Sequence, residues 1–477
     1  MNNDYLIGDC IARAHAVEQI AESLAMDEFP AEEPRSLAVA VGGLSRLIAQ
    51  HLVEVRHSAT YAPEKSVQHI RVVNGSLEHL SELLRYVDGA VTQKVPWSIV
   101  DPLQEVARRL VPGATIMLRP KWRYNYAIVL EDLAKWMREE FKYMVSYKDK
   151  KNEIDQLLGH VGGSFYIVSF PNIERKSVLL HAVLGHEIGH LVVEKFLASR
   201  AKDILPASLY KQIVASVDDE VKSEHMLPYF RDYEVSKRLG EVTAYRTRAI
   251  EEIGADMVGV NMLGPAALFG YYACAQTMAP NQPPSLRNDR YPPWVFRLRQ
   301  SLDQLEGLGY GNLDAPSSGF LKSFKAHITE IEALANRQED VGRNPLVKVA
   351  YEWVDQTLPK LKEYVKDVCT GKSLVQEPLR LWKQATSLAQ RLRQDLPPNT
   401  LDDTADPPSP ATTEAILNSG WLYRLAYLEG CPGGSDQEAA SRYRECRDKL
   451  DRLTLRGLEL AHLQREYEAR KKRRQMS

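Results

Sequence analysis

The chain has 477 residues, of which 44% are hydrophobic and 26% are charged, and its formal net charge is −2 at pH 7. This length exceeds that of a single compact core and predicts roughly two to four domains. The near-zero net charge excludes a general attraction to nucleic acid or anionic membranes, and five scattered cysteines without a CxxC pair argue against a disulfide framework or a cysteine zinc site.

Residues 1–112 are predicted to form an N-terminal helical region. Apolar residues recur at spacings of three and four over 31–55 and 76–93, as they do on the buried face of a helix. The first twenty residues carry acids and lack a basic stretch followed by an apolar one. We therefore expect no secretory signal and a cytoplasmic location.

Residues 113–300 are predicted to form the chemically active core. Short strands are expected at 114–119 and 164–170, where apolar and β-branched residues are bounded by turn residues. A long helix without internal proline is expected at 176–200. It is followed by a polar, irregular insertion at about 201–240.

The uncharged segment Met257–Ala279 is about as long as a membrane span. Asn261 and the Gly264–Pro265 pair interrupt its apolar character. We therefore expect it to hold the end of a helix that covers 241–263, then a turn and another helix in a buried core, with no membrane association.

Composition divides the remaining chain. Residues 301–394 are predicted as amphipathic helices, 395–434 as a proline-rich acidic linker with a short helix, and 435–477 as a basic helix. Residues 442–477 hold twelve Lys or Arg against six Asp or Glu. This helix end is either simply solvated or a contact for an acidic partner or nucleic acid. A packing seam is expected at Cys446, Leu450, Leu453, Leu460 and Tyr467.

The chemistry is concentrated in the stretch HAVLGHEIGH. His186, Glu187 and His190 form an H-E-x-x-H pattern, and residues four apart lie on one helical face, so two imidazoles can bind one zinc ion. Glu187 can then act as general base toward a water whose pKa the metal lowers. The structural alternative is a helix whose histidines form hydrogen bonds in the core.

The flanks of this pattern favour the metal interpretation. Gly185 and Gly189 each cost a helix about 1 kcal/mol relative to alanine, which indicates that something approaches the helix closely. His181 lies five residues before His186 and therefore about 140° around the helix. We expect it to contribute to the core or to support a ligand rather than to bind the same ion.

A third ligand is expected from the stretch EEIGAD. Glu252 and Asp256 are four residues apart on one face, which suits Glu252 for binding metal and Asp256 for accepting the other N–H of a ligand histidine. Glu251 is the rival ligand, although it is expected to face away. The alternative is a surface pair of acids.

HEIGH followed by EEIGADMVGVNMLGP resembles the gluzincins, the zinc metallopeptidases with a glutamate as third ligand. It is similar in particular to the ImmA/IrrE-type peptidases of bacteria, whose pattern is a glutamate, an Ala-Asp or Ala-Asn pair, and a Leu-x-Pro ending one helix later. The resemblance implies His186, His190 and Glu252 as zinc ligands, Glu187 as general base and Asp256 as the hydrogen-bond partner of a ligand.

This resemblance covers roughly residues 160–300 and has two departures from the family pattern. About sixty residues separate His190 from Glu252, so an insertion must lie between them. Val258 and Gly259 replace the Phe-Ala that the ImmA-type pattern favours. A group that stabilises the developing oxyanion is also expected, and the candidates are Tyr245, Tyr271, Tyr272, Tyr291 and His225.

We therefore predict a mainly α (α+β) fold in which a zincin-like core with a small sheet and the HExxH helix is flanked by helical regions. The predicted function is that of a zinc-dependent metallopeptidase acting on a protein or peptide substrate. One alternative is a metal-stabilised regulatory or binding module of a sensor or stress-response protein, without proteolytic turnover. Another is a helical adaptor that acts through residues 435–477.

Overall fold

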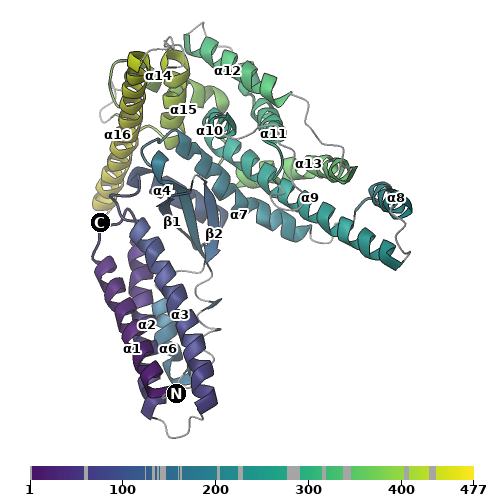
Figure 1. Cartoon of the computed structure of the whole chain (residues 1–477). Coiled ribbons are helices and arrows are strands. Elements are labelled where there is room, and N and C mark those ends of the chain that lie inside the picture. Colours follow the sequence, from purple (N-terminus) through teal and green to yellow (C-terminus); the bar gives the residue numbers. More distant parts are fainter. Residues whose placement is uncertain are drawn as a thin grey trace. The chain divides into compact units, whose positions relative to one another are not determined.

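The chain divides between Lys176 and Ser177 into two compact units. The computed structural model shows a mainly α fold with a small sheet, as predicted, and the described part of this sheet has three strands (Figure 1). It describes all residues except 1–2, 58–62, 124, 132–134, 137–138, 140–146, 160, 162–163, 201–204, 224–228, 277–290, 314–318, 337–344, 402–407, 429–436 and 477.

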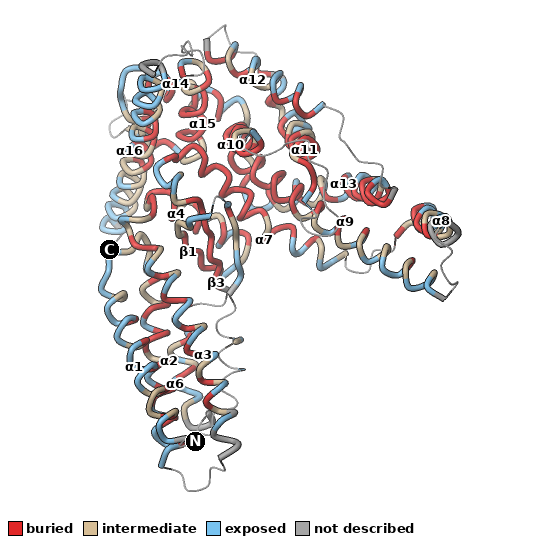
Figure 2. The backbone as a smooth tube through the Cα atoms, in the orientation of Figure 1, coloured by how far each residue is buried: buried red, intermediate tan, exposed pale blue. Residues whose placement is uncertain are grey.

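In the first unit, four helices lie side by side (Figure 1). Their apolar faces meet in one core, and Figure 2 colours the buried residues of these helices red. The helices predicted at 31–55 and 76–93 are therefore confirmed. The four helices are α1 (Asn3–Ala25), α2 (Glu32–His57), α3 (Pro63–Gly89) and α6 (Tyr147–Gly159).

By length and composition, α2 is the one helix among the described residues that could cross a membrane. In the structure, 67% of its most apolar window is buried. Leu44, Ile48 and Leu52 are fully enclosed at 0% exposure, and α1 and α3 pack against this helix. Packing within the first unit therefore accounts for its apolar composition.

The sheet also belongs to the first unit. Helix α4 (Trp97–Leu110) leads into β1 (Ala114–Lys121), which pairs in parallel with the central strand β3 (Ser164–Pro171). The strands predicted at 114–119 and 164–170 are thus confirmed. The third strand, β2 (Ala127–Glu131), pairs antiparallel with β3 and was not predicted, because five residues at a sheet edge show no clear alternation.

The second unit is built mainly of helices, and its described residues contain no strand longer than an isolated β-bridge. Helices α7 (Leu184–Ser199) and α9 (Tyr229–Leu263) pack along each other, and α11 (Trp294–Gly307) and α13 (Pro345–Gly371) pack on α9 (Figure 1). The other helices of this unit are α8 (Ala207–Ser223), α10 (Pro265–Gln276), α12 (Gly319–Ala335), α14 (Pro378–Arg393), α15 (Thr413–Tyr423) and α16 (Gln437–Met476). Short helical turns lie at Leu180–Val183, Tyr310–Asn312 and Arg424–Leu428. The first unit has one such turn among its described residues, at Asn172–Glu174.

The segment predicted as one core, 113–300, contains the boundary between the two units. The sheet lies in the first unit because β1 packs on α2, α3 and α4, whereas α7 and α9 lie in the second. The prediction that 201–240 is irregular was wrong, because α8 and the start of α9 occupy most of this segment. Helix α8 carries many charged residues, but Leu209, Ile213 and Val217 are buried at a spacing of four residues.

Helix α7 begins at Leu184, eight residues later than predicted. The preceding residues Leu180–Val183 form a 3₁₀ turn, so His181 does not lie on the same α-helix as His186. His181 is buried. Among the described residues, it does not belong to the group whose donor atoms lie close enough together to bind one metal ion.

The predicted break at Gly264–Pro265 is confirmed between α9 and α10. Gly264 has φ +60°, a conformation that glycine adopts without steric cost at the end of a helix. Asn418 of α15 bonds both sides of this turn, since its side chain accepts from Ala266 N at 3.0 Å and donates to the carbonyl oxygen of Leu263 at 2.8 Å. The α9–α10 turn is therefore anchored from α15.

The predicted linker at 395–434 contains more structure than expected. Thr400 and Pro410 form a β-bridge, and α15 follows it. The C-terminal helix α16 is present, but its predicted seam was wrong, because Cys446 and Tyr467 are exposed. The residues that this helix does bury include Leu450, Thr454, Leu458 and Ala461, at spacings of three and four.

Candidate metal centre

Helices α7 and α9 approach closely enough that their backbones touch. A Cβ atom on Gly189 would lie 2.6 Å from the carbonyl oxygen of Ala255 and 2.7 Å from its Cα. One turn earlier, a Cβ on Gly185 would lie 3.3 Å from the Cα of Gly259. The close approach predicted from the two glycines is confirmed, and it brings the histidines of α7 against the acids of α9.

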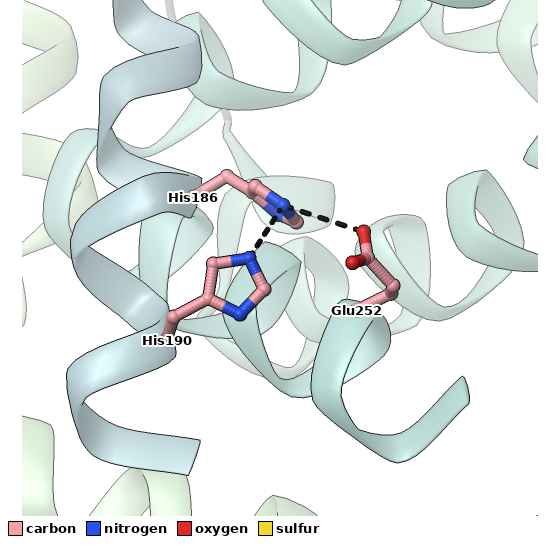
Figure 3. Close-up of side chains that lie close together, drawn as sticks. All are labelled: His186, His190 and Glu252. Atoms are coloured by element: carbon pink, nitrogen blue, oxygen red, sulfur yellow. Dashed lines mark hydrogen bonds and ion pairs between the residues drawn. The ribbon is translucent and has the colours of Figure 1, made fainter. Parts of the chain in front are cut away.

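His186, His190 and Glu252 meet between these helices, with one donor atom from each lying within 4.8 Å of the others (Figure 3). His186 Nε2 lies 3.2 Å from His190 Nε2 and 3.4 Å from Glu252 Oε2. Two tetrahedral ligands at about 2.0–2.1 Å from a zinc ion are about 3.3 Å apart, so these spacings fit donors to a single ion. Two imidazoles and a carboxylate are also a donor set that zinc accepts.

Asp256 fixes the orientation of the first histidine. His186 Nδ1 donates to Asp256 Oδ1 at 2.7 Å, and Asp256 is 1% exposed. Because the proton is held on Nδ1, the lone pair of Nε2 faces the cluster. The structure therefore places Asp256 where the sequence pattern predicted it.

Glu251 does not face away, contrary to the prediction. Its Oε1 lies 3.4 Å from His190 Nδ1, and its Oε2 lies 2.7 Å from Arg248 Nη1. Neighbouring residues of a helix point about 100° apart. Glu251 is therefore directed at His190, whereas Glu252 faces His186. Each histidine thus has a carboxylate at its Nδ1.

Two arginines of the cluster were not predicted from the sequence. Arg297 Nη1 lies 3.1 Å from Glu252 Oε2, and Arg248 Nη2 lies 3.0 Å from Glu252 Oε1. Arg248 could have been found, because it precedes Glu252 by four residues on the same helix. Arg297 lies on α11, and no local spacing connects it to the acids of α9.

The cluster holds more carboxylates than guanidinium groups. Its acids are Glu187, Glu251, Glu252 and Asp256. Arg248 and Arg297 form ion pairs with Glu251, Glu252 and Asp256. Burial lowers the pKa of His186, but Asp256 and Glu252 outweigh burial and raise it to about 10. Carboxylates gathered around two histidines are a setting that would suit a divalent cation.

Glu187 lies in the first turn of α7, next to His186, and is 5% exposed. Tyr271 of α10 lies near it, and burial, together with the charges of Asp256 and Glu187, raises the pKa of Tyr271 well above its ordinary value. The Tyr271 hydroxyl therefore keeps its proton, and it donates to the carbonyl oxygen of Asp256 at 3.4 Å. This hydrogen bond connects α10 to the backbone of α9 next to the metal-binding donors.

The five candidates for oxyanion stabilisation differ in accessibility. Tyr245 and Tyr271 are fully buried, Tyr272 is half-buried, and His225 lies outside the described residues. Tyr291 is 45% exposed, and the guanidinium of Arg248 lies 4.4 Å from its ring centre. Among the described candidates, Tyr291 is thus the one at the exposed side of the cluster.

Tyr271 also explains why Gly259 departs from the alanine of the ImmA-type pattern. A Cβ on Gly259 would overlap the Tyr271 hydroxyl, whereas the next nearest atoms are 3.2 Å and 3.3 Å away, in His186 and Gly185. We expect Gly259→Ala to lower the free energy of unfolding by about 1–3 kcal/mol, as overpacking does.

Tyr271→Phe should rescue this variant, because it removes the one overlapping atom. Denaturant unfolding of both single variants and the double variant would measure a favourable coupling energy of roughly 1 kcal/mol or more. Additive effects of the two substitutions would show that the Tyr271 hydroxyl does not occupy this space.

Comparisons of the chain with protein-family models, with curated proteins and with solved structures found no match. The resemblance to gluzincins therefore depends on the motif residues and on the geometry around His186, His190 and Glu252.

Proposed function

We propose that the chain is a zinc-dependent metallopeptidase. The observation that carries this proposal is the convergence of His186, His190 and Glu252 on one point, with Glu187 beside the first histidine. The three donors come from two separate helices, and Asp256 sets the tautomer of one of them. A surface pair of acids would not be buried against two histidines in this way.

A zinc ion held by these three residues supplies a Lewis acid that polarises a peptide carbonyl and lowers the pKa of water. Three protein ligands are the number found in catalytic zinc sites, which keep one position for water or substrate. In the proposed reaction, Glu187 accepts the proton of the attacking water and passes it to the leaving amine. Asp256 keeps His186 in the tautomer that presents Nε2.

The substrate is proposed to enter at the exposed side of the cluster. The side chains of His190, Glu251 and Arg248 are 14%, 31% and 32% exposed, whereas that of His186 is only 8% exposed. A protein or peptide chain at this side would reach His190 first and would pass Tyr291. The buried side, with Glu187 and Asp256, excludes bulk water from the proton transfer.

Metal analysis of the purified chain tests this proposal. We expect about one zinc per chain, loss of that zinc in a His186→Ala/His190→Ala variant, and cleavage of an unfolded protein substrate that a chelator stops and added zinc restores. A purified chain that contains no zinc and binds none in a calorimetric titration would contradict the proposal.

One observation favours the second candidate, a metal-stabilised binding or regulatory module without turnover. Both oxygens of Glu252 already pair with arginines, so the cluster is held together by ion pairs as well as by any metal. This candidate predicts that zinc binds and raises the melting temperature while no substrate is cleaved.

A further inference from the structure

We propose that Arg297 is a positioning residue, which holds Glu252 and Asp256 so that the metal donors face one point. This inference depends on the proposed function. Arg297 lies on α11 and is 6% exposed, and its guanidinium lies between two carboxylates that are one turn apart on α9.

All three nitrogens of the guanidinium are used. Nε donates to Asp256 Oδ2 at 2.7 Å, and Nη2 donates to Asp256 Oδ1 at 2.8 Å, which makes a two-pronged contact. Nη1 lies 3.1 Å from Glu252 Oε2, the same oxygen that faces His186. The planar group thus determines how both carboxylates are turned.

The guanidinium is itself held in place. It lies over the ring of Trp294, 4.2 Å from the ring centre, and Trp294 lies one turn earlier on α11. Stacking on an aromatic face leaves the edge of a guanidinium free for hydrogen bonds, and that edge is directed at α9. Helix α11 therefore fixes a group whose orientation the site needs.

Without Arg297, two buried acids would lose their main positive neighbour. Asp256 would keep His186 as its described side-chain partner, and Glu252 would keep Arg248, which is 32% exposed. Each carboxylate would then be free to turn, and the two would repel each other in a poorly solvated place. A lysine supplies the charge but only a single ammonium, so it cannot hold both carboxylates in the same geometry.

The chain offers a matched control in Arg246 on α9. This arginine is also buried, at 4% exposure, and also stacks on a tryptophan, Trp353, at 4.6 Å. Its Nη2 donates to Thr357 Oγ1 at 3.3 Å, and neither Arg246 nor Thr357 is one of the three donors. Substituting it removes a buried guanidinium and leaves the proposed site unchanged.

The test measures zinc affinity and stability separately on the full chain. Zinc is titrated calorimetrically into chelator-stripped wild type, Arg297→Met, Arg297→Lys and Arg246→Met, and melting temperatures are recorded with and without zinc. We expect Arg297→Met to weaken zinc binding about 10- to 100-fold, as loss of a group that orients a ligand does. Arg297→Lys should recover part of this loss, and Arg246→Met should change the zinc dissociation constant less than about twofold while lowering both melting temperatures.

Two results would overturn the inference: wild-type zinc affinity in Arg297→Met, or an equal loss of affinity in Arg246→Met, which would indicate general destabilisation. If Arg297→Met does not fold, Arg297→Lys decides the question, because full affinity there would show that the fork geometry is not needed. Failure of the wild type to bind zinc would instead overturn the proposed function itself.

Discussion

Glu187→Gln is expected to abolish peptide cleavage while the protein still binds zinc. The amide has nearly the shape of the carboxylate but cannot accept a proton, and Glu187 is not one of the three donors that converge. General acid–base catalysis contributes about 10²–10⁴-fold, so kcat on an unfolded protein substrate should fall by at least that factor. Zinc affinity should change little, because His186, His190 and Glu252 remain.

Glu194→Gln is the matched control, because Glu194 is an exposed glutamate on the same helix. Its cleavage rate and zinc affinity should equal those of the wild type. Cleavage that persists in Glu187→Gln would show that another group takes the proton. Loss of zinc from Glu187→Gln would show that Glu187 acts as a ligand rather than as a base.

Gly189→Ala is expected to destabilise the second unit and to weaken zinc binding together. The new methyl group would meet backbone atoms of Ala255 at 2.6–3.0 Å, and backbone cannot turn aside as a side chain can. The two helices would have to move apart, and His190 and Asp256 are sequence neighbours of the two residues that clash. We expect a loss of about 2–4 kcal/mol in the free energy of unfolding and a zinc affinity lower by at least about tenfold.

Gly240→Ala is the control for this prediction. Gly240 lies on α9, is exposed, and a Cβ there would have no atom within 4 Å. Alanine should stabilise the helix by up to about 1 kcal/mol and leave zinc binding unchanged. Denaturant unfolding and calorimetry report both quantities. Wild-type stability in Gly189→Ala would contradict the contact between α7 and α9.

Much of the candidate site was predictable, because its parts depend on helical spacing. His186 and His190 share a face of α7, and Glu252 and Asp256 share a face of α9, so each pair follows from a separation of four residues. That the two faces meet was predicted from the motif resemblance and from glycines on α7. Spacing alone does not join helices about sixty residues apart.

The parts that escaped prediction depend on tertiary contacts. Arg297 reaches the cluster from α11, and nothing near it in the sequence distinguishes it from an exposed arginine. Glu251 was expected to face away because its position on the helix was compared only with that of Asp256. In the structure, its partner is His190 on α7. The fold class was predictable from apolar periodicity, but the sheet was assigned to the same core as α7, since adjacency in sequence does not show where the boundary between units lies.

The bonds of Asn418 to Leu263 and Ala266 limit how this protein can be divided. A fragment that ends near residue 300 contains every residue proposed for catalysis, yet the backbone groups at the end of α9 would lose a partner supplied from α15. The two sequence motifs alone are therefore not a transferable module. Modular use of this site, in a fusion or a shortened gene, requires the chain at least as far as α15.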